Sequence, residues 1–291
     1  MKQIHVGVQA MMLKDKFREL GAYETLRKVG EIGYGSVEIS QIPMTAENVE
    51  QMKRAQADFG VKIASLSAGV APNGPQPQET LATHFDKIVA DCRALDCGFI
   101  RIGMLPMNCM GSYEAALHFC RMAEVAARKL ADNGIKLYYH NHHVEFQRFE
   151  GKTLLDIIRD NAPHLGFELD VHWIHRGGFD PVRVIADYAG LVDLIHLKDY
   201  RIAYKPLDMA SMAGKGDMKS MMQAFQQQFA SAVQFAEVGE GTLDMGAIIE
   251  QSLASGARYF FVEQDDLYGR DVFDCLKTSY DNIVKLGYEI I

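Results

Sequence analysis

The chain has 291 residues, of which 48% are hydrophobic and 23% are charged, and this composition is typical of a soluble globular enzyme. Its formal net charge of −8 and isoelectric point near 5.7 argue against a nucleic-acid-binding protein, because phosphate contacts need a concentrated positive surface. No stretch approaches the ~20 consecutive apolar residues that a membrane span needs.

The N-terminal segment resembles neither a signal peptide nor a transit peptide, because Gln9 and Lys14 interrupt its apolar residues. The five cysteines are odd in number and include no CxxC pair, which indicates buried or inert thiols in a reducing compartment. We therefore expect a cytoplasmic protein that binds no membrane.

Short apolar or β-branched segments recur along the chain, and stretches with helical periodicity separate them. The segments predicted as strands are residues 4–8, 37–39, 61–67, 99–102, 137–146, 166–170, 192–197 and 258–262. The stretches predicted as helices are residues 22–32, 47–59, 80–96, 113–133, 152–161, 181–188, 245–255 and 272–286.

Strands that alternate with helices, and glycines that end helices just before strands, predict an α/β protein with a (β/α)8 TIM barrel. We expect residues 1–291 to form a single TIM-barrel domain. A doubly wound sheet would carry a glycine-rich phosphate turn after an early strand, but the first strand runs into Gln9-Ala-Met-Met. The longest irregular connection, residues 199–218, is predicted to be an active-site loop.

Polar residues are densest at the end of the fifth predicted strand, where the chain reads His140, Asn141, His142, His143 and then Glu145. Burying such groups costs several kcal/mol unless each finds a partner or a metal. This density favours a functional site over a polar loop.

In such a barrel the active site lies at the C-terminal ends of the strands. The carboxylates, imidazoles and amine at or near those ends are Glu38, His140, His142, Glu145, Asp170, His172, His196, Lys198 and Glu263. Strands five to eight offer an O,O,N,O ligand set, which consists of Glu145, Asp170, His196 and Glu263. Such a set suits Mn²⁺, Co²⁺, Mg²⁺ or Zn²⁺. The alternative is that Asp170 and Glu263 form ordinary salt bridges with Lys198 and Arg101.

Five motifs resemble the sugar phosphate isomerase/epimerase family of xylose isomerase-like TIM barrels, over essentially the whole chain. They are YHNHHVEF (139–146), ELDVHW (168–173), HLKDY (196–200), VGEGTLD (238–244) and VEQD (262–265). The resemblance implies a metal held by one side chain from each of strands five to eight, and a homo-oligomer. The epimerases place a glutamate where this chain has His140. Either Glu145 reaches back as the ligand, which is the favoured interpretation, or His140 replaces it.

The expected function is that of a divalent-metal-dependent isomerase or epimerase of a sugar or keto-sugar, acting through a metal-stabilised enediolate, with Mn²⁺ as the preferred ion. Glu145 and Glu263 are the expected acid and base, with His140 or His142 as alternatives. Lys198 is expected to neutralise the enediolate oxygen.

Weaker candidates for contacts to a carbohydrate substrate are Glu38, His172, Trp173 and Glu240. Pairing with Arg101 explains Glu38 equally well, and core packing explains Trp173. No glycine-rich or arginine-rich phosphate pocket is visible, which favours a neutral polyol.

Other functions stay open. A lyase, either an inosose dehydratase or an enzyme of β-elimination on 3-keto-glycosides, is favoured by the histidine-rich fifth strand, because elimination needs an acid as well as a base. A non-catalytic binding protein on the same barrel is a further alternative. A phosphodiester hydrolase of the endonuclease IV type is opposed by the acidic isoelectric point.

Overall fold

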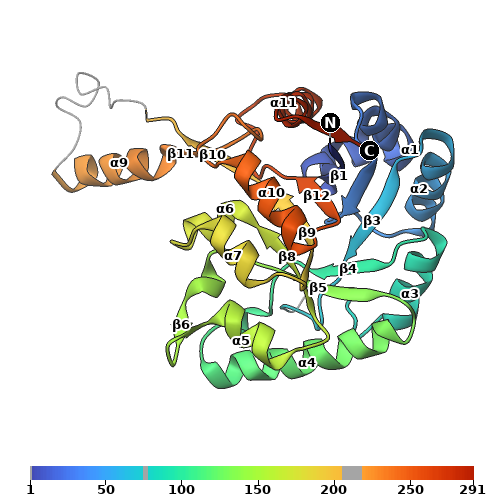
Figure 1. Cartoon of the computed structure of the whole chain (residues 1–291), viewed down its shortest axis with the longest axis horizontal. Helices are drawn as coiled ribbons and strands as arrows, with labels where there is room; N and C mark the ends of the chain where they lie inside the picture. Colours follow the sequence, from blue (N-terminus) through green and yellow to red (C-terminus); the bar gives the residue numbers. More distant parts are fainter. Residues whose placement is uncertain (1, 75–77, 205–217) are drawn as a thin grey trace.

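The computed structural model describes residues 2–74, 78–204 and 218–291, and its centre is a closed barrel of parallel strands (Figure 1). Around the barrel, the strands are β1 (Lys2–Gln9), β2 (Ser36–Ile39), β3 (Lys62–Ser67), β4 (Phe99–Ile102), β5 (Lys136–His140), β8 (Gly166–Asp170), β9 (Val192–Leu197) and β12 (Tyr259–Val262). Strand β12 pairs with β1 and closes the barrel. The predicted TIM barrel and its eight strands are thus confirmed.

The larger helices are α1 (Lys14–Ile32), α2 (Ala46–Phe59), α3 (Phe85–Ala94), α4 (Tyr113–Ala131), α5 (Leu154–Asn161), α7 (Pro181–Asp187), α10 (Met245–Ser255) and α11 (Val272–Lys285). All eight were predicted, with two notable shifts at their starts. Helix α1 extends back to Lys14, past a kink at Gly21 where φ is 79°. Helix α3 begins late because residues 80–84 form a turn, in which the His84 N–H donates to the Thr80 carbonyl (2.8 Å).

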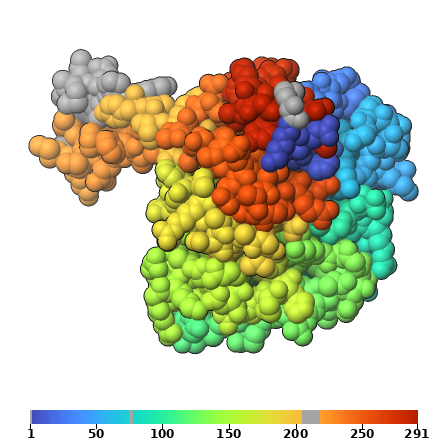
Figure 2. All heavy atoms as spheres, in the orientation of Figure 1, coloured from blue at the N-terminus to red at the C-terminus, as the bar shows by residue number. Residues whose placement is uncertain are grey.

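The sequence analysis missed several short elements. They are the 3-10 helices η1 (Ala10–Leu13), η2 (Met107–Cys109) and η3 (Val144–Phe146), the helices α6 (Val171–Arg176) and α9 (Met218–Ser231), and the strands β6 (Arg148–Phe149), β7 (Lys152–Thr153), β10 (Asp199–Ile202), β11 (Val233–Ala236) and β13 (Tyr288–Ile290). Strands β10 and β11 form an antiparallel pair. With α9 they project from the barrel (Figures 1 and 2). Of the predicted active-site loop, residues 199–202 form β10, and residues 205–217 lie outside the described part of the chain.

Local capping explains where the barrel helices begin and end. Helix α2 begins after Thr45, whose side chain accepts from the Asn48 N–H, and it ends at Gly60, whose φ of 70° suits glycine. Helix α10 is likewise capped by Asp244 and ended by Gly256. Because these signals are local, they fix the spacing between strands and so the position of each strand end.

Alternation along the strands divides the barrel interior into two layers. A small apolar cluster fills one layer with Ala64, Tyr138, Leu194, Tyr259 and Phe261. Side chains two residues apart on a strand share a face, so the inward residues that follow Tyr138, Leu194 and Phe261 are His140, His196 and Glu263. The interior is therefore apolar toward the N-terminal ends of the strands and polar toward their C-terminal ends.

The five cysteines are all free and buried, as predicted. None of the helices in the described ranges combines the length and the hydropathy needed to cross a membrane.

Close packing of β1 against β2 yields the first testable prediction. A Cβ at Gly7 would lie 2.5 Å from the Ser36 carbonyl oxygen and 2.7 Å from its carbon, both backbone atoms of the neighbouring strand. We expect Gly7→Ala to lower the free energy of unfolding by about 1–3 kcal/mol through overpacking. Urea denaturation measures this difference in the free energy of unfolding.

Gly98→Ala is the matched control, because a Cβ at Gly98 meets no atom within 4 Å. Equal stability of the two variants would contradict the prediction.

Candidate active site

Four buried side chains converge where the barrel opens. His140 ends β5, Asp170 ends β8, His196 lies in β9, and Glu263 follows β12 directly. Each offers one possible ligand atom, and these four atoms all lie within 4.8 Å of one another. A second group, Glu38, Glu168 and His196, meets the same criterion. His196 therefore belongs to both groups.

The two ring nitrogens of His196 face different carboxylates. Nδ1 lies 2.6 Å from Oε2 of Glu263, and Nε2 lies 3.1 Å from Oε1 of Glu38 and 3.2 Å from Oε2 of Glu168. Burial alone would lower the pKa of His196, but the charges of these carboxylates raise it well above the usual value. The ring is thus held between two sets of anions.

Beneath His196, Arg101 ties two of these carboxylates together. Its Nε lies 2.9 Å from Oε1 of Glu38 and 3.5 Å from Oε2 of Glu168, and its Nη2 donates to Oγ of Ser40 (3.0 Å). Burial raises the pKa of Glu38, but Arg101 and His196 outweigh burial and bring it to about 2. Burial and the nearby Glu38 charge raise the pKa of Glu168 to about 8.

Glu168 also contacts His140, the other histidine among the four converging side chains. Its Oε2 lies 3.2 Å from Nδ1 of His140, at the same distance as from Nε2 of His196. A carboxylate that contacts one ring nitrogen sets the ring orientation and leaves the other nitrogen for a ligand. One buried carboxylate therefore orients both imidazoles.

Lys198 supplies a buried positive charge beside Asp170 and Glu263. Its Nζ lies 2.6 Å from Asp265, 3.4 Å from Glu263 and 3.8 Å from Asp170, and 4.9 Å from the ring centre of Trp173. Burial lowers its pKa, but these carboxylates outweigh burial and raise it, so the amine stays protonated. The alternative interpretation of ordinary salt bridges is therefore correct in part. Lys198 lies near Asp170 and Glu263 as it required, whereas Arg101 contacts Glu38 and Glu168 instead.

Asp170 keeps one oxygen free for a further ligand. Its Oδ1 accepts from the Trp173 N–H (3.0 Å), while its Oδ2 is buried and has no hydrogen-bond partner among the described residues. Burial raises the pKa of Asp170 to about 7 despite the nearby Lys198. A dication would remove the cost of burying this carboxylate.

The imidazoles fit the same role. Burial lowers the pKa of His140 well below its usual value, so this imidazole is neutral and can offer a lone pair. Metal binding would release the proton that the carboxylates hold on His196. Two nitrogens from His140 and His196 and two oxygens from Asp170 and Glu263 then suit Mn²⁺, Co²⁺ or Zn²⁺ better than Mg²⁺, which prefers oxygen ligands. The residues present thus fit a divalent transition metal.

Glu145, the favoured strand-five ligand of the sequence analysis, does not join the group. It lies in η3, where its Oε1 accepts from the Tyr139 hydroxyl (2.6 Å) and its Oε2 from the His142 N–H (2.7 Å). The turn after β5 directs its carboxylate to these donors, which satisfy both of its oxygens. The geometry therefore favours His140, the alternative that the sequence left open.

A cavity of about 410 Å³ opens above the group. Four of the five predicted catalytic residues line it, namely His140, His142, Lys198 and Glu263, together with Gln9, Ser40, Arg101 and Asp265. Glu145, the fifth, is not among the lining residues. Volumes in this range hold a small ligand.

The four predicted sugar-binding residues lie outside the wall of this cavity. Glu38 lies beneath His196 and pairs with Arg101. His172 is buried against Tyr200 and Phe235, and Trp173 stacks on His143 with ring centres 5.1 Å apart. Glu240 is exposed and accepts from Nδ2 of Asn282 (2.9 Å).

The polar residues of the site that had no assigned role in the sequence analysis include Gln9, Ser40, Glu168 and Asp265. Gln9 donates from Nε2 toward Oε1 of Glu263 at 3.5 Å. Glu168 and Asp265 each lie two residues from a predicted ligand, Asp170 or Glu263. The two-residue period of strands was thus the signal that could have found them.

Comparison with known proteins relates this geometry to known barrels. A search of curated proteins found no match. Three similar solved structures are a sugar phosphate isomerase/epimerase from Parabacteroides distasonis (21% identity, 98% of both chains covered, TM-score 0.74), 3-keto-D-glucoside 4-epimerase from E. coli (16%, 98% of this chain and 99% of that one, 0.64) and a probable 3-DHS dehydratase from Bacillus anthracis (14%, 98% and 99%, 0.65).

At these identities the solved structures show a shared fold. The family model is more specific, because it matches residues 26–271, which include the strand ends that carry all four converging side chains. The chain belongs to the xylose isomerase-like TIM barrel family.

Proposed function

We propose that this protein is a divalent-metal-dependent isomerase or epimerase of a sugar or keto-sugar. The observation that carries the proposal is the convergence of His140, Asp170, His196 and Glu263 next to a cavity of about 410 Å³, which two of them, His140 and Glu263, line. The names of two similar structures, an isomerase/epimerase and a keto-glucoside epimerase, support it. A cytoplasmic location and a homo-oligomeric assembly stay predictions.

The four converging side chains would hold the ion. A bound dication would polarise a substrate carbonyl and acidify the adjacent C–H bond. Glu168 would keep the imidazoles of His140 and His196 oriented, because it contacts one ring nitrogen of each. Arg101 would hold Glu168 in place through its own contact with that side chain.

Glu263 is the group best placed to remove the proton. It lines the cavity, and although burial raises its pKa, Lys198 and His196 outweigh burial and keep the carboxylate ionised. Lys198, protonated and 3.4 Å from Glu263, would stabilise the negative charge that develops on the substrate oxygen.

His142 is the proposed partner for the second proton transfer. Burial, and then the Lys198 charge, lower its pKa to about 4, so the ring is neutral. A neutral ring would return a proton as a relay, taking one from water in the cavity at one nitrogen while it gives one to the substrate carbon from the other. It follows β5, whereas Glu263 follows β12, and β8 and β9 separate these strands around the barrel. The two groups thus line the cavity from different sides, and proton return opposite to removal inverts a stereocentre.

A lyase is the second candidate. Elimination needs a proton donor for the leaving group as well as a base, and Lys198 is a protonated donor in the wall of the same cavity. The similarity to a probable dehydratase supports this candidate.

The metal proposal predicts that protein purified without chelators and dialysed against Mn²⁺, Co²⁺ or Zn²⁺ retains about one ion per chain. Asp170→Asn should weaken metal binding at least ~100-fold, because it removes the charge of the unpartnered carboxylate oxygen. Elemental analysis and metal titration measure this. Asp180→Asn is the control, because Asp180 caps α7 and asparagine caps equally well. Full metal retention in Asp170→Asn would contradict the ligand assignment.

Glu168→Gln should weaken metal binding by ~10–100-fold while leaving all four ligands in place, because both imidazoles lose their contact with a carboxyl group. Glu237→Gln is a burial-matched control, since Glu237 is 1% exposed and Glu168 0%, but Glu237 pairs with Arg270 and Arg201. If both variants bound metal alike, Glu168 would have no orienting role.

The proton-transfer proposal predicts that the metal-loaded protein, incubated in D2O with a panel of ketoses and 3-keto-glycosides, incorporates deuterium at the carbon beside the carbonyl. Glu263→Gln should lower kcat by ~10²–10⁴-fold, with metal content measured in parallel. NMR detects the exchange, and ultraviolet absorption of an enone would identify a lyase instead. Enone formation without exchange into recovered substrate would overturn the isomerase proposal.

A further inference from the structure

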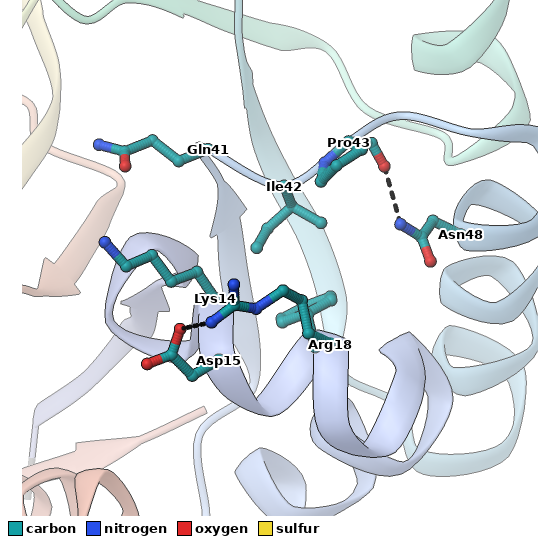
Figure 3. Close-up of a pocket in the computed structure, with 8 residues that line it drawn as sticks. Lys14, Asp15, Arg18, Gln41, Ile42, Pro43 and Asn48 are labelled. Atoms are coloured by element: carbon teal, nitrogen blue, oxygen red, sulfur yellow. Dashed lines mark hydrogen bonds and ion pairs between the residues drawn. The ribbon is translucent and has the colours of Figure 1, made fainter.

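A second and larger cavity, of about 590 Å³, lies between the start of α1 and the loop that joins β2 to α2 (Figure 3). Its polar side chains are those of Lys14, Asp15, Arg18, Gln41 and Asn48. Buried Phe17 and Ile42, with Pro43, add an apolar surface. The volume is sufficient for one further sugar-sized group.

This cavity adjoins the candidate active site. Gln41 lines both cavities. The chain also links them at η1, because Met11 lines the active-site cavity and Lys14, just past the end of η1, lines the second one. The two cavities therefore share a boundary at Gln41.

Gln41 lies in a bend after β2 and has a left-handed backbone. Its φ is 58°, a left-handed conformation that is unfavourable for a residue with a Cβ. Its exposed side-chain amide makes no hydrogen bond with any other described residue, and Figure 3 shows it extending to the same side as Lys14. Such strain, at the boundary of two cavities, is typical of a ligand contact.

Lys14 gives the second cavity a local positive charge. Asp15, the only acidic residue of the lining, pairs with Arg18 at 2.5 Å, and Lys14 has no ion-pair partner in the described ranges of the chain. The lining therefore carries one uncompensated positive charge in a protein whose net charge is −8. Figure 3 shows the Asp15–Arg18 pair and the side chain of Lys14, which extends away from that pair.

The geometry points to a subsite for an acidic sugar unit, bearing a carboxylate or a phosphate, that is joined to the sugar held in the active-site cavity. This inference rests on the proposed function, because it extends the substrate of that site. Lys14 binds the acidic group, the Gln41 amide binds a hydroxyl, and the apolar surface packs against the C–H face of the ring.

The test is a set of ligand titrations by saturation-transfer NMR on the whole chain in the presence of a chelator, with glucuronate, glucose 6-phosphate and glucose as probes. We expect at least one acidic sugar to bind 10-fold or more tightly than glucose, and the probe that binds identifies carboxylate or phosphate. Lys14→Met should remove this preference, and Lys53→Met, which removes an exposed charge from α2 outside the cavity, should keep it.

Gln41→Gly separates binding from folding. It relieves the left-handed strain, so we expect an unchanged or higher Tm together with at least 3-fold weaker binding of the acidic sugar. Equal binding of glucose and both acids, or a preference that survives Lys14→Met, would overturn the subsite. Because the titrations need neither metal nor turnover, their result is independent of whether the isomerase proposal holds.

Discussion

The burial of several carboxylates around one imidazole is the constraint on which the site depends. Glu38, Glu168, Asp170 and Glu263 are all at most 5% exposed and lie close to His196. An isolated buried charge would cost many kcal/mol, so each carboxylate must find a cation or a proton. Arg101 and Lys198 supply two permanent positive charges, at opposite sides of the His196 ring. The carboxylate of Asp170 remains poorly compensated, and that deficit is what a bound dication would correct.

The barrel makes this arrangement rigid. Three inward side chains of the polar layer follow an aromatic or aliphatic inward residue of the apolar layer: His140 follows Tyr138, His196 follows Leu194 and Glu263 follows Phe261. The apolar layer excludes water from below and lowers the local dielectric, which strengthens the charge pairs above it. The cavity that His140 and Glu263 line lies at the C-terminal ends of the strands, on the polar side of the interior.

Proton chemistry beside a carbonyl needs groups in different protonation states within one small volume. The structure supplies an ionised carboxylate at Glu263, a neutral imidazole at His142 and a protonated amine at Lys198, all in the wall of one cavity. The reaction at such a site depends on which substrate carbon faces Glu263. If the carbon next to it carries a leaving group, elimination can follow proton removal; otherwise the substrate is isomerised or epimerised. The second cavity bears on this choice, because a subsite that holds a distant group fixes the position of the reacting ring.

The sequence by itself determined the barrel, its eight strands and the strand ends that carry Asp170, His196 and Glu263, because strand alternation, helix caps and glycine stops are local signals. It could not decide between His140 and Glu145, since that choice depends on the turn after β5, which directs Glu145 to the Tyr139 hydroxyl. Nor could it show that Glu168 contacts two imidazoles from other strands, or that Lys14 and Gln41 share a cavity. Only the pairing of neighbouring strands brings Glu168 to His140 and His196, and Lys14 near Gln41, because the members of each pair belong to successive β/α units and no local pattern links them.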